Sequence, residues 1–309
     1  MTIIPPDYLR LINNRERVMS KIQTFFHVGY ARAASTFLQK TIFPALIGLQ
    51  YIPRNNFRVR ESEKKRFKSD KILMSREAGE YIYDRCDKVH QVFDSKVIIS
   101  VRRHDVLAAS TYRLYAKNGH TFRHDKFLDV VNNNGVRRVE DFTYMHLVNY
   151  VEKQTGSKPL LLIFEDYISD PDFYIDSLCA YLQCSIDKAT LSHRAVHKSY
   201  SDKQLRLRRQ FSDKYVSQEK NLAELDSSNI EDYTRWKNLK EKVLVRVSGI
   251  FMRLARFAPD SWLDDEPLLI ESHSQAIREY FADDWAQCYD YVEQQSLELG
   301  VKRNTPVVV

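Results

Sequence analysis

The sequence predicts an α/β protein: a three-layer α/β/α fold around a central parallel sheet, with a helical C-terminal portion. Two observations predict it. Short apolar runs alternate with amphipathic helical patterns over residues 24–182, as expected of parallel strands covered on both faces. From residue 201 onward the pattern is almost wholly helical and highly charged. We therefore expect one domain over residues 1–309, with a core at 1–200 and a helical extension at 201–309 packed on it.

The predicted strands are short runs rich in Ile, Val, Leu and Phe. They lie at residues 24–30, 71–75, 96–102 and 159–164, and a weaker one lies at 49–52. Helical periodicity fills the gaps between them. Helices are expected from residue 35 to a stop or kink at Pro44, and then at 77–93, 104–117, 139–154, 171–182, 201–215, 231–257 and 272–297. Ser201 and Gln204 form a predicted capping box at the start of one of them.

Composition limits the possible partners. The net charge of +6 suits an anionic partner such as phosphate, sulfate or an acidic glycan, although a mild excess also serves solubility. No apolar run reaches the length needed to span a bilayer, and the N-terminal residues lack the apolar core of a signal peptide. The four scattered cysteines are interpreted as reduced packing residues of a cytoplasmic protein. No metal-ligand cluster is apparent.

The segment at residues 27–40, HVGYARAASTFLQK, carries the strongest functional signal. A strand ends, a short loop follows, and Ser35 and Thr36 open a helix whose free N–H groups favour an anion. Arg32 adds a cation with several donors. The segment lacks the second glycine and the lysine of a Walker loop and has no G-x-G-x-x-G. Alternatively, Ser35 and Thr36 merely cap an ordinary helix.

The pattern His-Val-Gly-x-x-basic-x-small-Ser-Thr-x-Leu resembles the 5′-phosphosulfate loop of PAPS-dependent sulfotransferases, particularly bacterial ones acting on carbohydrates. PAPS is 3′-phosphoadenosine 5′-phosphosulfate, and PAP is the product. The resemblance implies a P-loop-like fold and a nucleotide contact by Ala33, Ala34, Ser35, Thr36 and Phe37. Arg32, where the family usually has Lys, would stabilise charge on the leaving phosphate.

A second element supports the resemblance. Residues 96–115, KVIISVRRHDVLAASTYRLY, resemble the family's 3′-phosphate element of strand, Arg and a helical Ser eight residues later. The resemblance implies that Arg102 and Ser110 bind the 3′-phosphate. Alternatively, Arg102 makes a surface ion pair and Ser110 is exposed. Arg103 and His104 replace the family's usual Asn or Asp followed by Pro.

Two later segments also match the family. Glu165 and Asp166 follow a predicted strand, where we favour a structural role over catalysis. His197, Lys198 and Ser199 match a late loop that contacts PAPS, with His in place of Asn. The following Arg206, Arg208 and Arg209 are interpreted as a solvated helix face.

The general base is less well specified. Glu77 is the first candidate, because it follows a strand at the edge where ligands bind; alternatively it is a first-turn helix residue. Glu61 and His124 are weaker candidates, and His27 is more readily a core histidine. A basic stretch either binds an anionic saccharide or forms a solvated face; it comprises Arg54, Arg58, Arg60, Lys64, Lys65 and Arg66.

The sequence therefore predicts an enzyme that transfers a sulfuryl group from PAPS, without a metal, to a hydroxyl of a glycan, glycolipid or small metabolite. Two alternatives remain open. One is a kinase-like or NTPase-like nucleotide-binding protein, against which the missing Walker lysine argues. The other is a non-catalytic anion-binding protein, although no nucleic-acid-binding signature is present.

Overall fold

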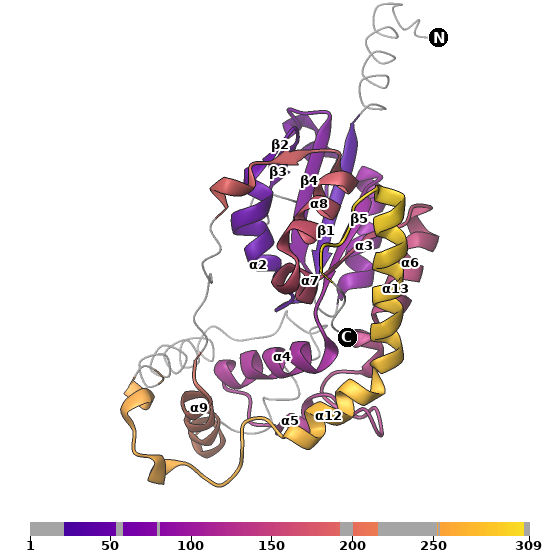
Figure 1. The fold of residues 1–309 in the computed structure, drawn as a ribbon. Coiled ribbons are helices and arrows are strands. Elements are labelled where there is room, and N and C mark those ends of the chain that lie inside the picture. The colour runs from indigo at the N-terminus through magenta and orange to yellow at the C-terminus, as the bar shows by residue number, and fades with distance from the viewer. Residues whose placement is uncertain are drawn as a thin grey trace, which may run out of the picture. The chain divides into compact units, whose positions relative to one another are not determined.

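The computed structural model describes residues 22–53, 58–78, 81–191, 200–215, 252 and 254–305. Within them lies a sheet of five parallel strands in the order β3-β4-β1-β5-β6 (Figure 1). The strands are β1 (Gln23–Gly29), β3 (Gln50–Ile52), β4 (Lys71–Glu77), β5 (Lys96–Val101) and β6 (Leu160–Ile163). The predicted α/β class with a parallel sheet is confirmed, and each predicted strand is present within two residues of its expected bounds.

Both faces of the sheet are covered because both sets of alternating side chains are apolar. On one face, Phe25, Leu73 and Ile98 join one buried cluster with η1 (Leu38–Ile42) and α8 (Pro171–Leu182). On the other face, the Thr24 hydroxyl donates to the carbonyl of Phe93, the last residue of α3 (Ile82–Phe93), at 2.6 Å. Helix α3 in turn packs on α6 (Tyr144–Thr155).

The described chain divides into two compact units, each formed from separate stretches of sequence. The first comprises the described residues within 1–102, 144–194 and 286–309 and contains the five-stranded sheet. The second comprises the described residues within 103–143 and 195–285. Its main helices are α4 (His104–Asn118), α5 (His124–Phe127), α9 (Asp202–Tyr215) and α12 (Glu271–Tyr280). The expectation of a single domain stays a prediction.

Helix α13 (Ala282–Leu299), yellow in Figure 1, contributes residues from 286 onward to the first unit, where it protects the free edge of β6. The Leu161 N–H donates to Gln295 Oε1 at 3.2 Å, and Gln295 Nε2 donates to the Pro159 carbonyl at 2.8 Å. A side-chain amide thus replaces the missing neighbouring strand, which satisfies backbone groups that would otherwise template aggregation.

Several helix boundaries differ from the prediction. The helix expected at 77–93 begins at Ile82, because Arg76 and Glu77 extend β4. The helix expected at 272–297 is two helices that break at Phe281. The predicted capping box is confirmed: Ser201 Oγ accepts the Gln204 N–H at 3.3 Å, and Gln204 Oε1 accepts the Ser201 N–H at 2.9 Å. Most of the helix expected at 231–257 lies outside the described residues.

The solvated face predicted for the arginines of α9 was wrong. Arg208 and Arg209 are only 5% and 3% exposed, and the Arg206 side chain is 21% exposed. The pattern misled because these arginines occupy the inner face of α9 beside Leu205 and Leu207, which are also buried. No helix among the described residues is long and apolar enough to cross a membrane.

Candidate anion-binding site

The strand order places the carboxyl ends of β1 and β5 at a topological switch point. The chain leaves β1 toward β3 on one side of the sheet and leaves β5 toward β6 on the other. Ligands of open α/β sheets bind in the crevice that such diverging connections leave. Both segments singled out from the sequence start there, because β1 ends at Gly29 and β5 ends at Val101, immediately before Arg102.

The loop after β1 has an alternating backbone conformation. Arg32 has a φ of 78° and Ala34 has a φ of 61° and a ψ of 7°, so both are left-handed, and α2 (Ser35–Phe37) follows in right-handed conformation. Alternation of this kind turns successive N–H groups toward one point and forms an anion-binding nest. Within the described residues, the N–H groups of Ala34, Ser35 and Thr36 donate to no protein acceptor. Three successive donors are therefore available to an anion.

This conformation is unusual for residues other than glycine and holds strain. Replacing Ala34 by glycine should relieve about 1–2 kcal/mol of left-handed strain, offset by about 0.4–1 kcal/mol of added freedom in the unfolded chain. We expect Ala34→Gly to raise the free energy of unfolding by up to about 1 kcal/mol and Ala34→Val to lower it by more than that. Urea denaturation measures both, and equal stabilities would contradict the left-handed assignment.

Buried hydroxyl groups form the floor beneath the loop. His27 is fully buried, and its Nδ1 and Nε2 lie 2.8 Å from Ser75 Oγ and 3.1 Å from Ser100 Oγ. The Ser35 hydroxyl donates to the Tyr30 carbonyl at 3.3 Å. A Cβ at Gly29 would lie 2.2 Å from Ser100 Oγ and 2.7 Å from Ser35 Oγ. Glycine is therefore required at position 29 so that the loop can lie this close to neighbouring strands.

His27 is a core histidine, as the sequence suggested, and burial lowers its pKa from 6.5 to about 3. Because its folded-state pKa is depressed, its contribution to stability is complete above pH 6.5 and is lost as the pH falls toward 3. Because of this group, we expect the free energy of unfolding to fall by up to about 1.4 kcal/mol for each unit by which the pH is lowered between 6.5 and about 3. In His27→Gln, the slope between about pH 6 and pH 4 should be shallower; an unchanged slope would show that His27 does not titrate this way.

Arg102 lies against the loop. Its Nη1 is 3.5 Å from the Arg32 carbonyl, and its guanidinium carbon lies 5.1 Å from the centre of the Phe164 ring. Its own carbonyl accepts a 2.7 Å hydrogen bond from the buried Tyr144 hydroxyl. The Tyr144 ring also packs on the Tyr30 ring, with centres 5.1 Å apart. One tyrosine thus ties the end of β5 to the start of the loop after β1.

Glu77 ends β4 directly beside Gly29 in the strand register and is half-buried. The alternative placement of this residue in the first turn of a helix was wrong, because α3 starts five residues later. A carboxylate at the end of β4 therefore neighbours the start of the loop, on the side of β1 away from β5.

The other predicted site residues fall elsewhere. Ser110 is half-buried on α4 of the second unit, whereas Arg102 belongs to the first. His197, Lys198 and Ser199 lie outside the described residues. His124 is 1% exposed, its Nδ1 accepts the Ile270 N–H at 3.1 Å, and burial lowers its pKa to about 4. Its surroundings are those of a core histidine, so His124 does not fit the role of an accessible base.

Two residues of the basic stretch after β3 form ion pairs with neighbouring carboxylates. In η4 (Glu61–Arg66), Lys64 pairs with Glu61 at 2.9 Å and Arg66 pairs with Glu63 at 2.8 Å. These exposed i,i+3 pairs are typical of a solvated face. Glu61, a weaker candidate for the general base, thus forms an ion pair with Lys64.

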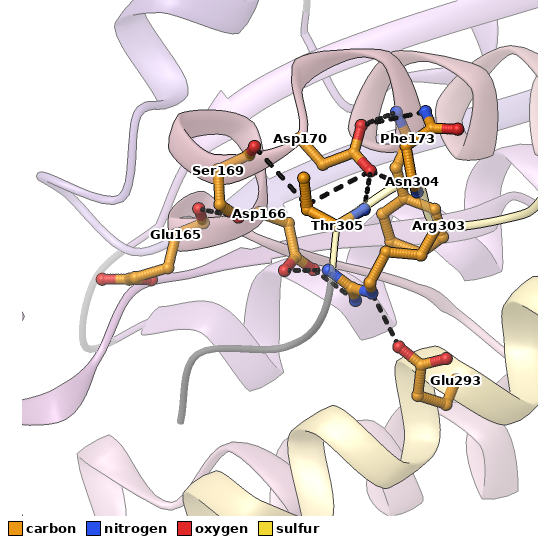
Figure 2. A network of polar contacts seen from close by, with 9 residues as sticks. All are labelled: Glu165, Asp166, Ser169, Asp170, Phe173, Glu293, Arg303, Asn304 and Thr305. Atoms are coloured by element: carbon orange, nitrogen blue, oxygen red, sulfur yellow. Dashed lines mark hydrogen bonds and ion pairs between the residues drawn. The ribbon is translucent and has the colours of Figure 1, made fainter.

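Asp166 takes the structural role expected of it. It lies in α7 (Phe164–Ser169), and its two carboxylate oxygens accept bonds of 2.5 and 3.1 Å from Arg303 near the C-terminus (Figure 2). The Arg303 guanidinium also lies 4.1 Å from the centre of the Phe173 ring. Asp170 caps α8 through the Phe173 N–H and accepts the Asn304 N–H at 2.6 Å. These carboxylates hold the C-terminal segment on α7 and α8.

The sequence did not indicate three residues that hold the site or the segments beside it: Tyr144, Phe164 and Arg303. Phe164 directly follows β6 at the same edge of the sheet, so strand order would have indicated it. Tyr144 and Arg303 act over more than 40 and 130 positions of sequence, respectively, and no local pattern marks them. No group of three or more His, Cys, Asp or Glu residues able to hold a metal ion occurs in the described part of the chain.

No family model, curated protein or solved structure matches this chain.

Proposed function

We propose that the protein is a PAPS-dependent sulfotransferase with a P-loop-like nucleotide site at the carboxyl ends of β1 and β5. The observation that carries the proposal is the loop at residues 30–37. Next to its left-handed residues Arg32 and Ala34, three successive N–H groups have no acceptor among the described residues, and the guanidinium of Arg102 lies beside the loop. Such a loop suits the 5′-phosphosulfate, and the arginine suits a second phosphate.

In this proposal, each group has a distinct task. The N–H groups of Ala34, Ser35 and Thr36, with Phe37 closing the turn, hold the 5′-phosphate. The exposed Arg32 stabilises the charge that grows on the bridging oxygen as the sulfuryl group departs. Glu77 takes the proton of the acceptor hydroxyl. Arg102 binds the 3′-phosphate, and Ser110, His197, Lys198 and Ser199 stay the further PAPS contacts that the sequence resemblance implies.

The kinase-like alternative is less well supported. The only basic side chain within the loop is Arg32, three positions before the place of a Walker lysine, and position 35 holds serine. A sulfuryl group carries less charge than a phosphoryl group, so its transfer needs less neutralisation. The acceptor we expect is a hydroxylated glycan, glycolipid or small metabolite.

The test is sulfate transfer from PAPS carrying radioactive sulfur to a panel of sugars, glycolipids and small alcohols. We expect transfer by the wild type, retention of most of it in Arg32→Lys, and loss in Arg32→Ala. Magnesium-dependent ATP hydrolysis without PAPS turnover would favour the kinase-like alternative. Failure of the wild type both to transfer sulfate and to bind PAP would refute the proposal.

A further inference from the structure

The second unit contains a buried arginine without a counter-charge. Seven of its described arginines have a side-chain nitrogen within 4.0 Å of a carboxylate oxygen: Arg103, Arg113, Arg123, Arg137, Arg206, Arg209 and Arg278. Arg208 is 5% exposed and its Nε is fully enclosed, yet no hydrogen bond or ion pair joins it to an acceptor among the residues that the structure describes. Burying an uncompensated cation is unfavourable by several kcal/mol, so a missing partner is implied.

The surroundings of Arg208 supply a second unsatisfied donor. Ser212 lies one turn further along α9 and is fully buried, and its hydroxyl has no partner in the described stretches of the chain. Both side chains lie over Gly119. A Cβ there would lie 2.7 Å from Arg208 Nη2 and 3.1 Å from Ser212 Oγ. The absence of a side chain at Gly119 is what leaves room for the guanidinium.

Capping of α4 does not explain the arginine. The carbonyls of Ala116 and Tyr115 at the end of α4 already accept hydrogen bonds of 3.1 Å from the N–H groups of Gly119 and His120. Burial lowers the pKa of Arg208, and no carboxylate of the described residues opposes that effect. Within the described part of the chain, the guanidinium therefore has no acceptor.

The ends of the neighbouring elements are accessible. Lys117 and Asn118 at the end of α4 are exposed, and Gly119 is half-buried. The Lys117 Nζ lies 5.6 Å from the centre of the Tyr200 ring. A planar guanidinium with a hydroxyl donor beside it matches an anion that has several acceptor oxygens.

We propose that Arg208 and Ser212, over Gly119, form an oxyanion site in the second unit that takes a phosphate or sulfate group, either free or carried on a larger molecule. The site is built from side chains of α9 and the turn after α4, and it does not depend on the nucleotide site proposed above. The bound anion supplies the acceptor oxygens that the buried arginine lacks.

The test compares Arg208→Met and Ser212→Ala with the control Arg206→Met, which removes an arginine of the same helix that pairs with Asp264. Inorganic phosphate is added at constant ionic strength, followed by thermal unfolding and hydrogen exchange of peptides covering residues 115–121 and 205–213. A second arm uses glucose 6-phosphate. Tighter binding of the sugar phosphate would show that the site takes a phosphate carried on a larger molecule. Tighter binding of inorganic phosphate would show that it takes the free ion.

In the wild type and in Arg206→Met, we expect phosphate to raise the melting temperature and protect both peptides. Arg208→Met should lose both effects, and Ser212→Ala should need at least several-fold more phosphate. Because Ser212→Ala removes only a hydroxyl, it tests the site even if Arg208→Met folds poorly. Phosphate protection that persists in Arg208→Met, or that is missing from the wild type, would overturn the proposal.

Discussion

Replacing Arg102 by alanine should weaken PAP binding by about 10- to 150-fold, because a hydrogen-bonded, charge-assisted contact contributes about 1.5–3 kcal/mol. The structure holds this guanidinium between the Arg32 carbonyl and the Phe164 ring, with its backbone fixed by Tyr144. A side chain fixed in this way loses little freedom on binding, so most of its interaction with a phosphate should appear as affinity.

The decisive readout for Arg102 is the ratio of affinities for PAP and for 5′-AMP, measured by calorimetry. The ratio should be large in the wild type and close to one in Arg102→Ala, since the two ligands differ in the 3′-phosphate. Arg103→Ala is the matched control. Arg103 is the next residue and pairs with Asp105, which Arg278 also binds at 2.8 Å. An equal loss of PAP affinity in both variants would argue against a 3′-phosphate contact by Arg102.

The second large effect concerns stability. Replacing Arg303 by methionine should lower the free energy of unfolding by about 3–5 kcal/mol, because it leaves the Asp166 carboxylate buried and unpaired. Asp166 is 4% exposed, and the Arg303 side chain is 8% exposed. The double variant Asp166→Asn/Arg303→Met should regain most of the lost stability, because the buried charge is gone. Urea denaturation of the single and double variants measures the coupling.

Lys158→Met provides the control for this comparison. Lys158 and Glu298 form an ion pair whose side chains are both about half exposed, and breaking it should change stability by less than about 1 kcal/mol. Losses of similar size in Lys158→Met and Arg303→Met would mean that the Asp166–Arg303 pair is not the buried anchor described here.

The same pair predicts a pH dependence. Burial raises the pKa of Asp166, and Arg303 opposes that rise, so removing Arg303 raises the pKa further. An acid whose pKa is raised in the folded state has no effect on stability at low pH, where it is protonated in both states. It destabilises the protein once the pH rises above the pKa that the group has in the unfolded chain. The difference between wild type and Arg303→Met should therefore shrink at acid pH. A difference that stays constant with pH would indicate lost packing on Phe173 rather than an unpaired carboxylate.

The sheet could be predicted because its information is local. Each strand is a continuous apolar run, and helical periodicity separates one run from the next, so the strand positions follow from residue order alone. The same locality explains the helix boundaries that were wrong. Glu77 is compatible with a helix start by composition, and only pairing of β4 with β1 keeps it in a strand.

The candidate site was only partly predictable. The loop and Arg102 were found because each directly follows a strand, and parallel strands share their carboxyl edge. The anchors Tyr144 and Arg303 come from distant segments, and tertiary packing alone selects them. The burial of Arg208 was missed for a related reason. Three arginines in one helix indicate a solvated face, unless carboxylates or a ligand bind them on the buried side of the helix.

Amide NMR of the wild type titrated with PAP tests the central claim most directly. If the loop after β1 holds the 5′-phosphate, the N–H signals of Ala34, Ser35 and Thr36 should move strongly and saturate with one equivalent of PAP. Their exchange with water should slow as well. If those three signals stay unchanged at saturating PAP, the phosphate does not bind in this loop and the proposed nucleotide site is wrong.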